Sequence, residues 1–218
     1  MISKLRQTAL LALLAACTAQ AGVYVDARVS HLAISGTPEI GDIGRTLDED
    51  FPTVAYSLAV GTTITSRLKA EVRFTDLGDI DVLKVSPYWT IMPPIPEVIL
   101  PVERYYRYQQ TTRLYSLALP ISVWENKQFS FIVTPLVNVE QSRVVLEDMF
   151  INATAAGIFA PYPDSRYLDT DRTKVRIGTE ATLAYRTSNY MQLSLTYSYH
   201  SLQAYDAHLI GAGLGWDY

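Results

Sequence analysis

The chain has 218 residues, of which 49% are hydrophobic and 18% are charged, and its formal net charge is −4. Plentiful aromatic and β-branched residues exclude a mainly disordered chain, and the acidic balance excludes a basic nucleic-acid-binding protein. A single cysteine excludes a disulfide framework and a cysteine-rich zinc site. The length fits one domain, since all-β barrels often reach this size as a single unit.

The first 21 residues have the pattern of a secretory signal peptide. Lys4 and Arg6 form a positive segment, and residues 8–16 form an apolar segment too short to span a bilayer as a helix. Ala19 and Ala21 form a small-x-small cleavage motif, which predicts Gly22 as the first residue of the mature chain. The sequence therefore predicts a signal peptide over 1–21 and an outer-membrane β-barrel domain over 22–218.

Cys17 leaves a second interpretation of this segment open. Residues 14–17 read Leu-Ala-Ala-Cys, which resembles a lipoprotein cleavage box and would make Cys17 the acylated first residue. Strand-like sequence starts at once at Gly22, with no tether after Cys17, which favours plain cleavage. Both interpretations predict an exported protein.

The rest of the chain alternates with a period of two residues. In the segment 67–75, every second residue from Leu68 to Phe74 is apolar and the residues between them are mostly charged, which separates two faces on a strand but mixes them on a helix. Strands of about 9–11 residues are long enough to cross a bilayer when tilted. The pattern predicts eight such strands, over residues 22–34, 53–65, 67–75, 112–124, 129–143, 173–186, 190–200 and 207–218.

The connections between these strands are alternately short and long. Short polar turns are predicted at 65–67, 125–128 and 187–189, and longer loops at 35–52, 76–111, 144–172 and 201–206. This asymmetry is typical of outer-membrane barrels, whose short turns face the periplasm and whose long loops face outward. We therefore predict an all-β fold, an eight-stranded antiparallel up-and-down transmembrane β-barrel.

The polar face of each strand should then line the interior. A bilayer offers no water to unpaired backbone groups, so the sheet must close with its apolar face toward lipid. An eight-stranded barrel is only wide enough for side chains to fill it, so its charges must pair. We predict a salt-bridged plug, with a polar conduction path as the alternative. The predicted charge network comprises Asp26, Arg28, Lys69, Glu71, Arg73, Glu140, Lys174, Arg176 and Glu180, alongside the inward polar residues Asn138 and Gln192.

Aromatic residues are predicted at both ends of the strands, as rings at the two membrane interfaces. The outer row comprises Tyr56, Phe74, Tyr115, Tyr197 and Tyr199, and the periplasmic row comprises Phe129, Tyr185, Tyr190, Trp216 and Tyr218.

The last predicted strand alternates outward through Ile210, Leu214, Trp216 and a final Tyr218. This resembles the C-terminal recognition strand of outer-membrane proteins, and the resemblance implies the barrel-assembly machinery as a partner.

Residues 59–78 (AVGTTITSRLKAEVRFTDLG) resemble the strand–turn–strand of OmpA-like transmembrane domains and related small outer-membrane barrels. The matching features are the region of Gly61, the tight polar turn, an inward Glu71 and the exit from Phe74 to Gly78. Family members often carry tyrosine where Phe74 stands. The resemblance implies eight strands in a Gram-negative outer membrane, with outer-membrane lipids and lipopolysaccharide as partners. The peptidoglycan-binding domain of longer relatives is not expected here.

Chemistry-bearing motifs are sparse. His31, His200 and His208 have no metal-ligand spacing, so no metal or cofactor is expected. His200 and Ser201 invite comparison with outer-membrane lipid A deacylases, but adjacent residues on a strand point to opposite faces, which prevents the nucleophile–base contact.

The long loops are the remaining place for function. Residues 35–52 are acidic, and residues 86–108 alternate prolines with large apolar side chains, which predicts either a cap over the barrel mouth or a contact for a partner or glycolipid. Residues 149–160 fit either a strand extension or an interfacial helix. The favoured function is a non-enzymatic envelope protein whose surface loops bind a ligand. The alternatives are a small pore or passage for small hydrophobic solutes, and a lipid-modifying enzyme.

Overall fold

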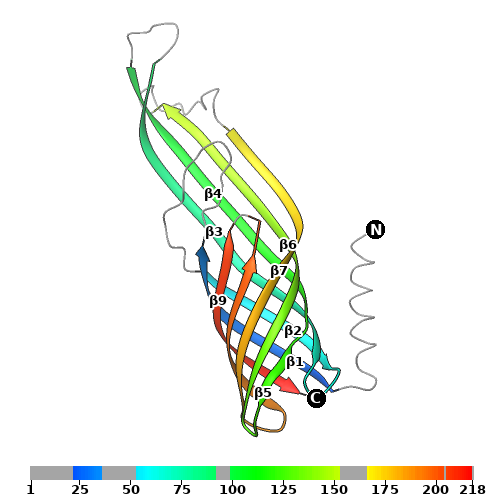
Figure 1. The fold of residues 1–218 in the computed structure, drawn as a ribbon. Helices are drawn as coiled ribbons and strands as arrows, with labels where there is room; N and C mark the ends of the chain where they lie inside the picture. Colours follow the sequence, from blue (N-terminus) through cyan, green and yellow to red (C-terminus); the bar gives the residue numbers. More distant parts are fainter. Residues whose placement is uncertain (1–21, 36–52, 92–98, 153–165, 204, 218) are drawn as a thin grey trace. The chain divides into compact units, whose positions relative to one another are not determined.

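The computed structural model describes residues 22–35, 53–91, 99–152, 166–203 and 205–217 (Figure 1). At positions 53, 82–91, 99–105, 148–152 and 166 it describes the backbone but not the side chains. The predicted signal peptide, Cys17, most of the acidic loop and Tyr218 lie outside the described residues. So do residues 153–165, and the predicted cap or contact formed by the side chains of the proline-rich segment falls largely outside the described side chains.

The described chain is built from antiparallel strands. In chain order they are β1 (Val23–Ser35), β2 (Thr53–Thr63), β3 (Lys69–Ile91), β4 (Ile99–Ala118), β5 (Ile121–Glu125), β6 (Phe129–Asn152), β7 (Arg166–Arg186), β8 (Met191–Ser201) and β9 (Asp206–Asp217).

The sheet closes on itself as eight strands. Strand β1 pairs with both β2 and β9, while β4 pairs with both β3 and β6. Strands β4 and β5 both pair with β6 and are separated only by Leu119 and Pro120. Pro120 has no N–H to donate, but its carbonyl accepts from the backbone N–H of Lys69 at 2.9 Å. We therefore count β4 and β5 as one interrupted strand, and the predicted eight-stranded antiparallel barrel is confirmed.

Short polar turns connect the strands at one end. The side-chain oxygen of Asn126 accepts from the backbone N–H groups of Gln128 at 2.8 Å and Phe129 at 2.7 Å. The hydroxyl of Thr65 similarly accepts from the N–H of Leu68 at 3.1 Å. Asparagine and threonine side chains stabilise tight turns in this way, which explains why the polar turns predicted from the sequence form here.

The chain forms two compact units. Among the described residues, the barrel unit comprises 22–35, 53–78, 113–140, 174–203 and 205–217. The extension unit comprises 79–91, 99–112, 141–152 and 166–173, where β3, β4, β6 and β7 continue. Gly78 ends the second segment of the barrel unit with a φ of 77°, a conformation that glycine adopts without a steric penalty. Its N–H donates to the side chain of Asp76 at 3.0 Å.

Strand lengths in the extension unit correct the sequence prediction. Residues 76–111 and 144–172 were expected to be loops, but β3 reaches Ile91, β4 starts at Ile99, β6 reaches Asn152 and β7 starts at Arg166. The prolines within residues 76–111 suggested that the hydrogen bonds between neighbouring strands stop there. A proline removes only one donor, however, and a strand tolerates this where that donor would face away from its partner.

Polar pairs across the strands hold the extension unit together. Arg107 pairs with Asp81 at 2.9 Å, and Arg143 pairs with Asp169 at 2.7 Å. Opposite charges on neighbouring strands stabilise a sheet modestly. They do not produce the alternation of apolar residues from which strands were predicted, so these strand segments were not expected. Hydrogen bonds from the guanidinium groups lower the pKa of Asp81 and of Asp169.

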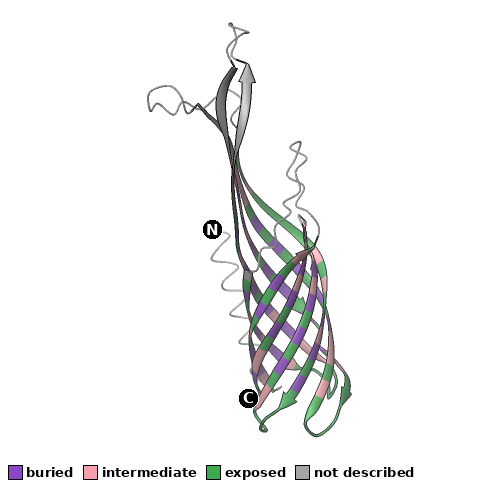
Figure 2. Cartoon of the chain, turned by 90° about the vertical axis from the view of Figure 1, so that its left-hand side faces the viewer, coloured by how far each residue is buried: buried purple, intermediate pink, exposed green. Residues whose placement is uncertain are grey.

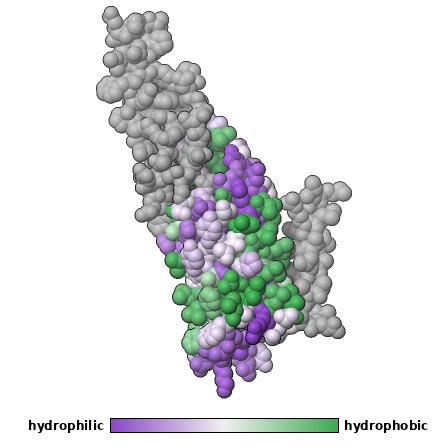
Figure 3. Space-filling model, in the orientation of Figure 1, coloured by the Kyte–Doolittle hydropathy of each residue, from purple (hydrophilic) through white to green (hydrophobic). Residues whose placement is uncertain are grey.

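The barrel unit has its polarity inverted relative to a water-soluble protein. Buried and exposed residues alternate along its strands (Figure 2). The outward residues include Leu58, Leu183 and Leu195, which are 46–59% exposed, whereas Glu71 and Glu180 are at most 4% exposed. Figure 3 shows a band of hydrophobic residues on the barrel, bordered by hydrophilic residues at the end with the turns. An apolar band of this kind suits contact with the hydrocarbon interior of a bilayer.

Exposed aromatic rings lie toward both ends of the strands in the barrel unit. Phe129 and Tyr185 pack with ring centroids 5.0 Å apart near the turns, and Phe74 and Tyr115 pack at 5.4 Å toward the other end. Such rings mark the two membrane interfaces. Within the described residues, the structure contains no helix that is both long and apolar enough to cross a membrane.

Closure of the sheet into a barrel gives a direct prediction about folding. The chain should fold only in detergent or lipid, and the folded protein should migrate differently on a gel before and after heating, because a closed barrel resists unheated detergent. Electrophoresis with and without heating measures this. A monomer that is soluble and folded in detergent-free buffer would contradict it.

Candidate functional site: the barrel interior

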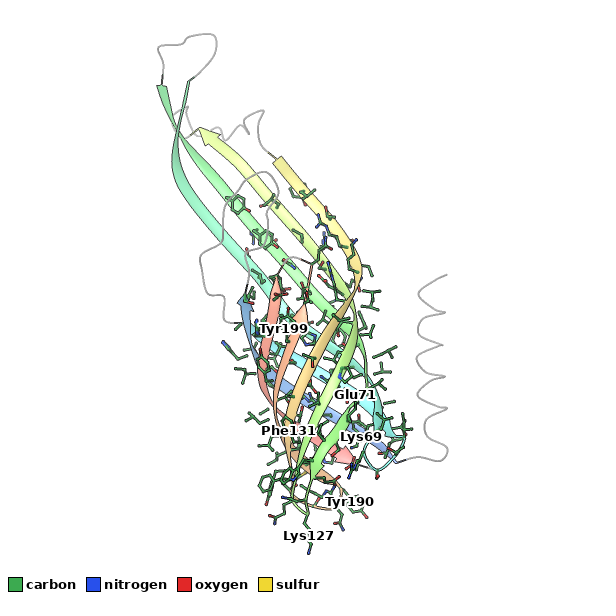
Figure 4. All side chains as sticks on the ribbon, in the orientation of Figure 1. Lys69, Glu71, Lys127, Phe131, Tyr190 and Tyr199 are labelled. Atoms are coloured by element: carbon green, nitrogen blue, oxygen red, sulfur yellow. The ribbon has the colours of Figure 1, made fainter. Side chains whose placement is uncertain are left out.

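The barrel interior holds a connected group of charged side chains and one phenol from three strands. We call it the lumen cluster; it comprises Tyr24, Asp26 and Arg28 on β1, Glu71 and Arg73 on β3, and Glu180 on β7. Their spacing of two residues along each strand places them on the inward face. Figure 4 shows Glu71 within the barrel and Lys69 closer to the turns.

Glu180 joins the two arginines across the interior. Its carboxylate pairs with Nη1 of Arg28 at 2.6 Å and accepts from Nη2 of Arg73 at 3.0 Å. A second hydrogen bond to Arg73, from Nη1, makes that contact bidentate. The hydroxyl of Thr182 also donates to Glu180 at 3.3 Å. Because Glu180 is 3% exposed, these contacts replace its lost hydration.

Arg73 connects Glu180 to a second carboxylate. Its Nε donates to Glu71 Oε1 at 2.7 Å, and the phenol of Tyr24 donates to Glu71 Oε2 at 2.8 Å. Gly61 makes room for this phenol, because a Cβ there would lie 2.5 Å from the Tyr24 oxygen. On the β1 side of the cluster, Arg28 Nε donates to Asp26 at 2.7 Å. The cluster is thus one continuous chain of ion pairs, which ends at Tyr24 in a hydrogen bond.

The other residues predicted for the charge network make no ion pair with this cluster among the described contacts. Lys69 is partly buried, with its Nζ 4.2 Å from the ring centroid of Tyr24 and 3.6 Å from Asp217. Glu140 and Arg176 form a separate pair at 3.5 Å, and Glu140 also accepts from the backbone N–H of Gln203 at 3.0 Å. Lys174 is exposed near the boundary of the barrel unit, where its side chain has left the packed interior.

Neutral polar side chains form another chain of contacts in the interior. Ser116 donates to the Asn138 oxygen at 2.7 Å, and the Asn138 amide lies 3.1 Å from Nδ1 of His200. His200 is 2% exposed, whereas the neighbouring Ser201 lies on the other face of β8. The adjacent His200 and Ser201 therefore do not form a nucleophile–base pair.

Apolar side chains fill the interior at the strand ends away from the turns. The buried side chains Leu32, Leu77, Leu202 and Leu209 are 0–6% exposed. They come from the ends of β1 and β9, from β3 next to Gly78 and from the residue that directly follows β8. Tyr205 is buried with them at 4% exposure. Sequence analysis missed this apolar layer because it assigned every apolar face to lipid. These buried side chains form an apolar layer between the charged cluster and the strand ends away from the turns.

Two spaces in the interior are bordered by described residues. A cavity of about 20 Å³ lies among residues of the lumen cluster, close to what a single water requires. A larger space of about 240 Å³ opens at the turn end, where Lys69, Arg186 and Asp217 contribute to its wall. We call it the vestibule. It does not continue as a space of similar size beside the lumen cluster.

Side chains suited to a metal ion do not gather in the described residues. No group of three or more histidine, cysteine or acidic side chains is arranged to hold one. The carboxylates of the lumen cluster face guanidinium or phenol groups instead, which leaves them committed to ion pairs rather than to a ligand.

Comparisons with known proteins gave matches among solved structures alone. No family model and no curated protein sequence matches the chain. Among solved structures, it is similar to the Yersinia pestis attachment invasion locus protein Ail, with 8% identity and a TM-score of 0.44 over 91% of this chain and 99% of that one. The outer-membrane protease OmpT of Escherichia coli matches with 9% identity and a TM-score of 0.47, over 90% of this chain and 97% of that one. Neisserial surface protein A matches with 12% identity and a TM-score of 0.40, over 90% and 97% of the two chains.

The protein is an eight-stranded outer-membrane β-barrel. This conclusion follows from the closed sheet, whose outer wall is apolar and whose interior is charged. Only a bilayer favours apolar residues outside and charged residues inside a closed sheet. The OmpA-like resemblance of residues 59–78 implied the same fold.

Two features of the interior were not predicted from the sequence, each for an identifiable reason. Tyr24 was not assigned to the network, because only charged and amide side chains were placed inward. Its position two residues before Asp26 was the available signal, since strand periodicity places both inward. The contact between Asn138 and His200 joins residues 62 positions apart on different strands, and only the closed register brings them together.

Proposed function

We propose that the chain is a non-conducting outer-membrane barrel that contributes to envelope structure and presents its extended strands to the outside. The observation that carries the proposal is the filled interior. The lumen cluster crosses it, and Leu32, Leu77, Leu202 and Leu209 fill it toward the loop end. A small pore and a passage for hydrophobic solutes are both less favoured, because each needs a continuous open path. In this proposal the interior also performs no catalysis.

The proposal implies the partners of a barrel embedded in the outer membrane. Outer-membrane lipids and lipopolysaccharide would contact the apolar band, and the barrel-assembly machinery would read the outward residues of β9, among which Ile210 is 58% and Trp216 is 37% exposed. A surface ligand would bind the segments beyond the barrel unit.

Labelling of single cysteines on intact cells tests this orientation. Tyr167→Cys lies in the extension unit, where Tyr167 is 67% exposed, and we expect an impermeant thiol reagent to reach it. Asn126→Cys lies in a short turn and should react only after the outer membrane is opened. Cys17 is replaced by serine in both proteins. Labelling of the turn in intact cells, with protection of position 167, would invert the proposed topology.

A further inference from the structure

The outer wall of the barrel carries a hydrogen-bonded serine, histidine and tyrosine that the lumen-based proposal does not use. The Ser35 hydroxyl lies 2.8 Å from Nε2 of His208, and the Tyr197 hydroxyl lies 2.8 Å from Nδ1 of the same ring. We call these three residues the wall triad. Strand β1 pairs with β9, and β9 pairs with β8, so closure of the barrel brings the three residues together. Ser35 and His208 are 173 positions apart in the chain.

This arrangement has the order of contacts that a serine nucleophile requires. With its proton on Nδ1, the neutral imidazole donates to the Tyr197 oxygen and accepts from the Ser35 hydroxyl. His208 is then positioned as the base for Ser35, and Tyr197 orients the ring. The Tyr199 ring packs against His208 with centroids 5.3 Å apart, which further restricts the imidazole; Figure 4 labels Tyr199 on β8.

The wall triad lies at the level of exposed aromatic rings, where lipid headgroups and acyl esters meet the barrel. Tyr197 itself is 46% exposed, and Tyr199, which pairs with His208 across β8 and β9, lies on the same outward face. Amphipathic rings of this kind settle at the membrane interface. Ser35 ends β1 on its outward face, so its hydroxyl is accessible from outside the barrel.

An apolar groove lies on the same wall, closer to the turns. It has a volume of about 590 Å³ and is bordered by Ala27, Tyr56, Leu58, Ala212 and Leu214. The small side chains of Ala27 and Ala212 create the depression between larger neighbours. His208 and Ala212 are four residues apart on β9, so the groove begins about 13 Å from the imidazole along the strand. An acyl chain in the groove would extend from the triad into the hydrocarbon layer.

We propose that the wall triad hydrolyses acyl esters of membrane lipids, with Ser35 as the nucleophile, His208 as the base and the groove as the acyl-chain site. Ser35 Oγ bonds to the ester carbonyl carbon while its proton passes to His208 Nε2. The ester C–O bond then breaks, and the departing alcohol takes that proton. Water attacks the acyl–Ser35 ester with His208 again accepting a proton, which releases the fatty acid and restores the serine. A lipid-modifying enzyme was an alternative from the sequence, but through His200 and Ser201 rather than the wall triad. Absence of the proposed activity would leave the filled interior unaffected.

The test measures the reactivity of Ser35 directly. The purified barrel in detergent is incubated with a long-chain alkyl fluorophosphonate, and the adduct is located by peptide mass spectrometry. We expect one adduct on Ser35, none there in Ser35→Ala, and a labelling rate about 100-fold lower in His208→Ala, the usual size of a general-base contribution. Ser201→Ala is the matched control on the same rim and should label like the wild type. Gel mobility before and after heating verifies that each variant is folded.

Two further variants separate chemistry from packing. Tyr197→Phe should shift the pH dependence of the labelling rate, because it removes the group that orients His208. Ala212→Trp should fill the groove and remove the preference for a long-chain over a short-chain probe. Absence of an adduct on wild-type Ser35, or equal rates for the wild type and His208→Ala, would overturn the proposal.

Discussion

Glu180→Ala is expected to destabilise the barrel more than any other single change to the lumen cluster. Glu180 is the carboxylate that contacts both arginines, so its removal leaves Arg28 without its cross-lumen partner and Arg73 with Glu71 alone. Breaking a buried ion pair by removing one partner costs about 3–5 kcal/mol, because the remaining charge is buried and unhydrated. Urea unfolding in detergent, followed by tryptophan fluorescence, measures the change in the free energy of unfolding.

Two matched variants show whether this loss arises from burial. Glu125→Ala removes the same chemical group from an exposed pair with Arg186, whose separation is 3.1 Å, and should cost about 0–1 kcal/mol. Leu195→Ala removes an outward apolar side chain and should cost roughly 1 kcal/mol. If Glu180→Ala were as mild as Glu125→Ala, the lumen cluster would be hydrated rather than packed.

Gly211→Ala should disturb the seam where the first and last strands meet. Gly211 on β9 lies opposite Ser30 on β1, and an added Cβ would collide with the Ser30 side chain and lie 2.7 Å from the backbone oxygen of Val29. A backbone atom cannot turn aside as a side chain does, so the two strands must separate. Overpacking of this kind costs about 1–3 kcal/mol.

Gly215→Ala provides the control on the same strand. Its added Cβ would lie 3.0 Å from Cγ of Gln192, a flexible side chain that can move. We expect a smaller loss of stability than for Gly211→Ala, and normal gel mobility after folding. Equal unfolding midpoints for the two variants would show that the seam has more space than the structure gives it.

The fold was largely predictable because strand periodicity alone separates the two faces of each strand. That periodicity located Glu71, Arg73 and Glu180 on the inward face, and closure of the sheet then required them to meet. It failed beyond the barrel unit, where β3 and β6 continue through segments that lack apolar alternation. There the ladder carries polar pairs such as Arg143 with Asp169.

Contacts that depend on register could not be predicted from the sequence. Lys174 and Glu180 have the same parity on β7, so periodicity assigned both to the interior, but only Glu180 is deep enough to be buried. Ser35 and His208 are neighbours only because β1 pairs with β9 in one register, and a shift of one residue would turn either strand's outward side chains inward.

Conductance across a planar lipid bilayer tests the central claim most directly. The claim is that ion pairs and apolar side chains fill the interior and leave no continuous path for ions. Membranes containing the purified wild-type barrel should therefore show no steady single-channel steps, while gel mobility shows that the inserted protein is folded. Reproducible, long-lived current steps from the folded wild-type protein would contradict the account.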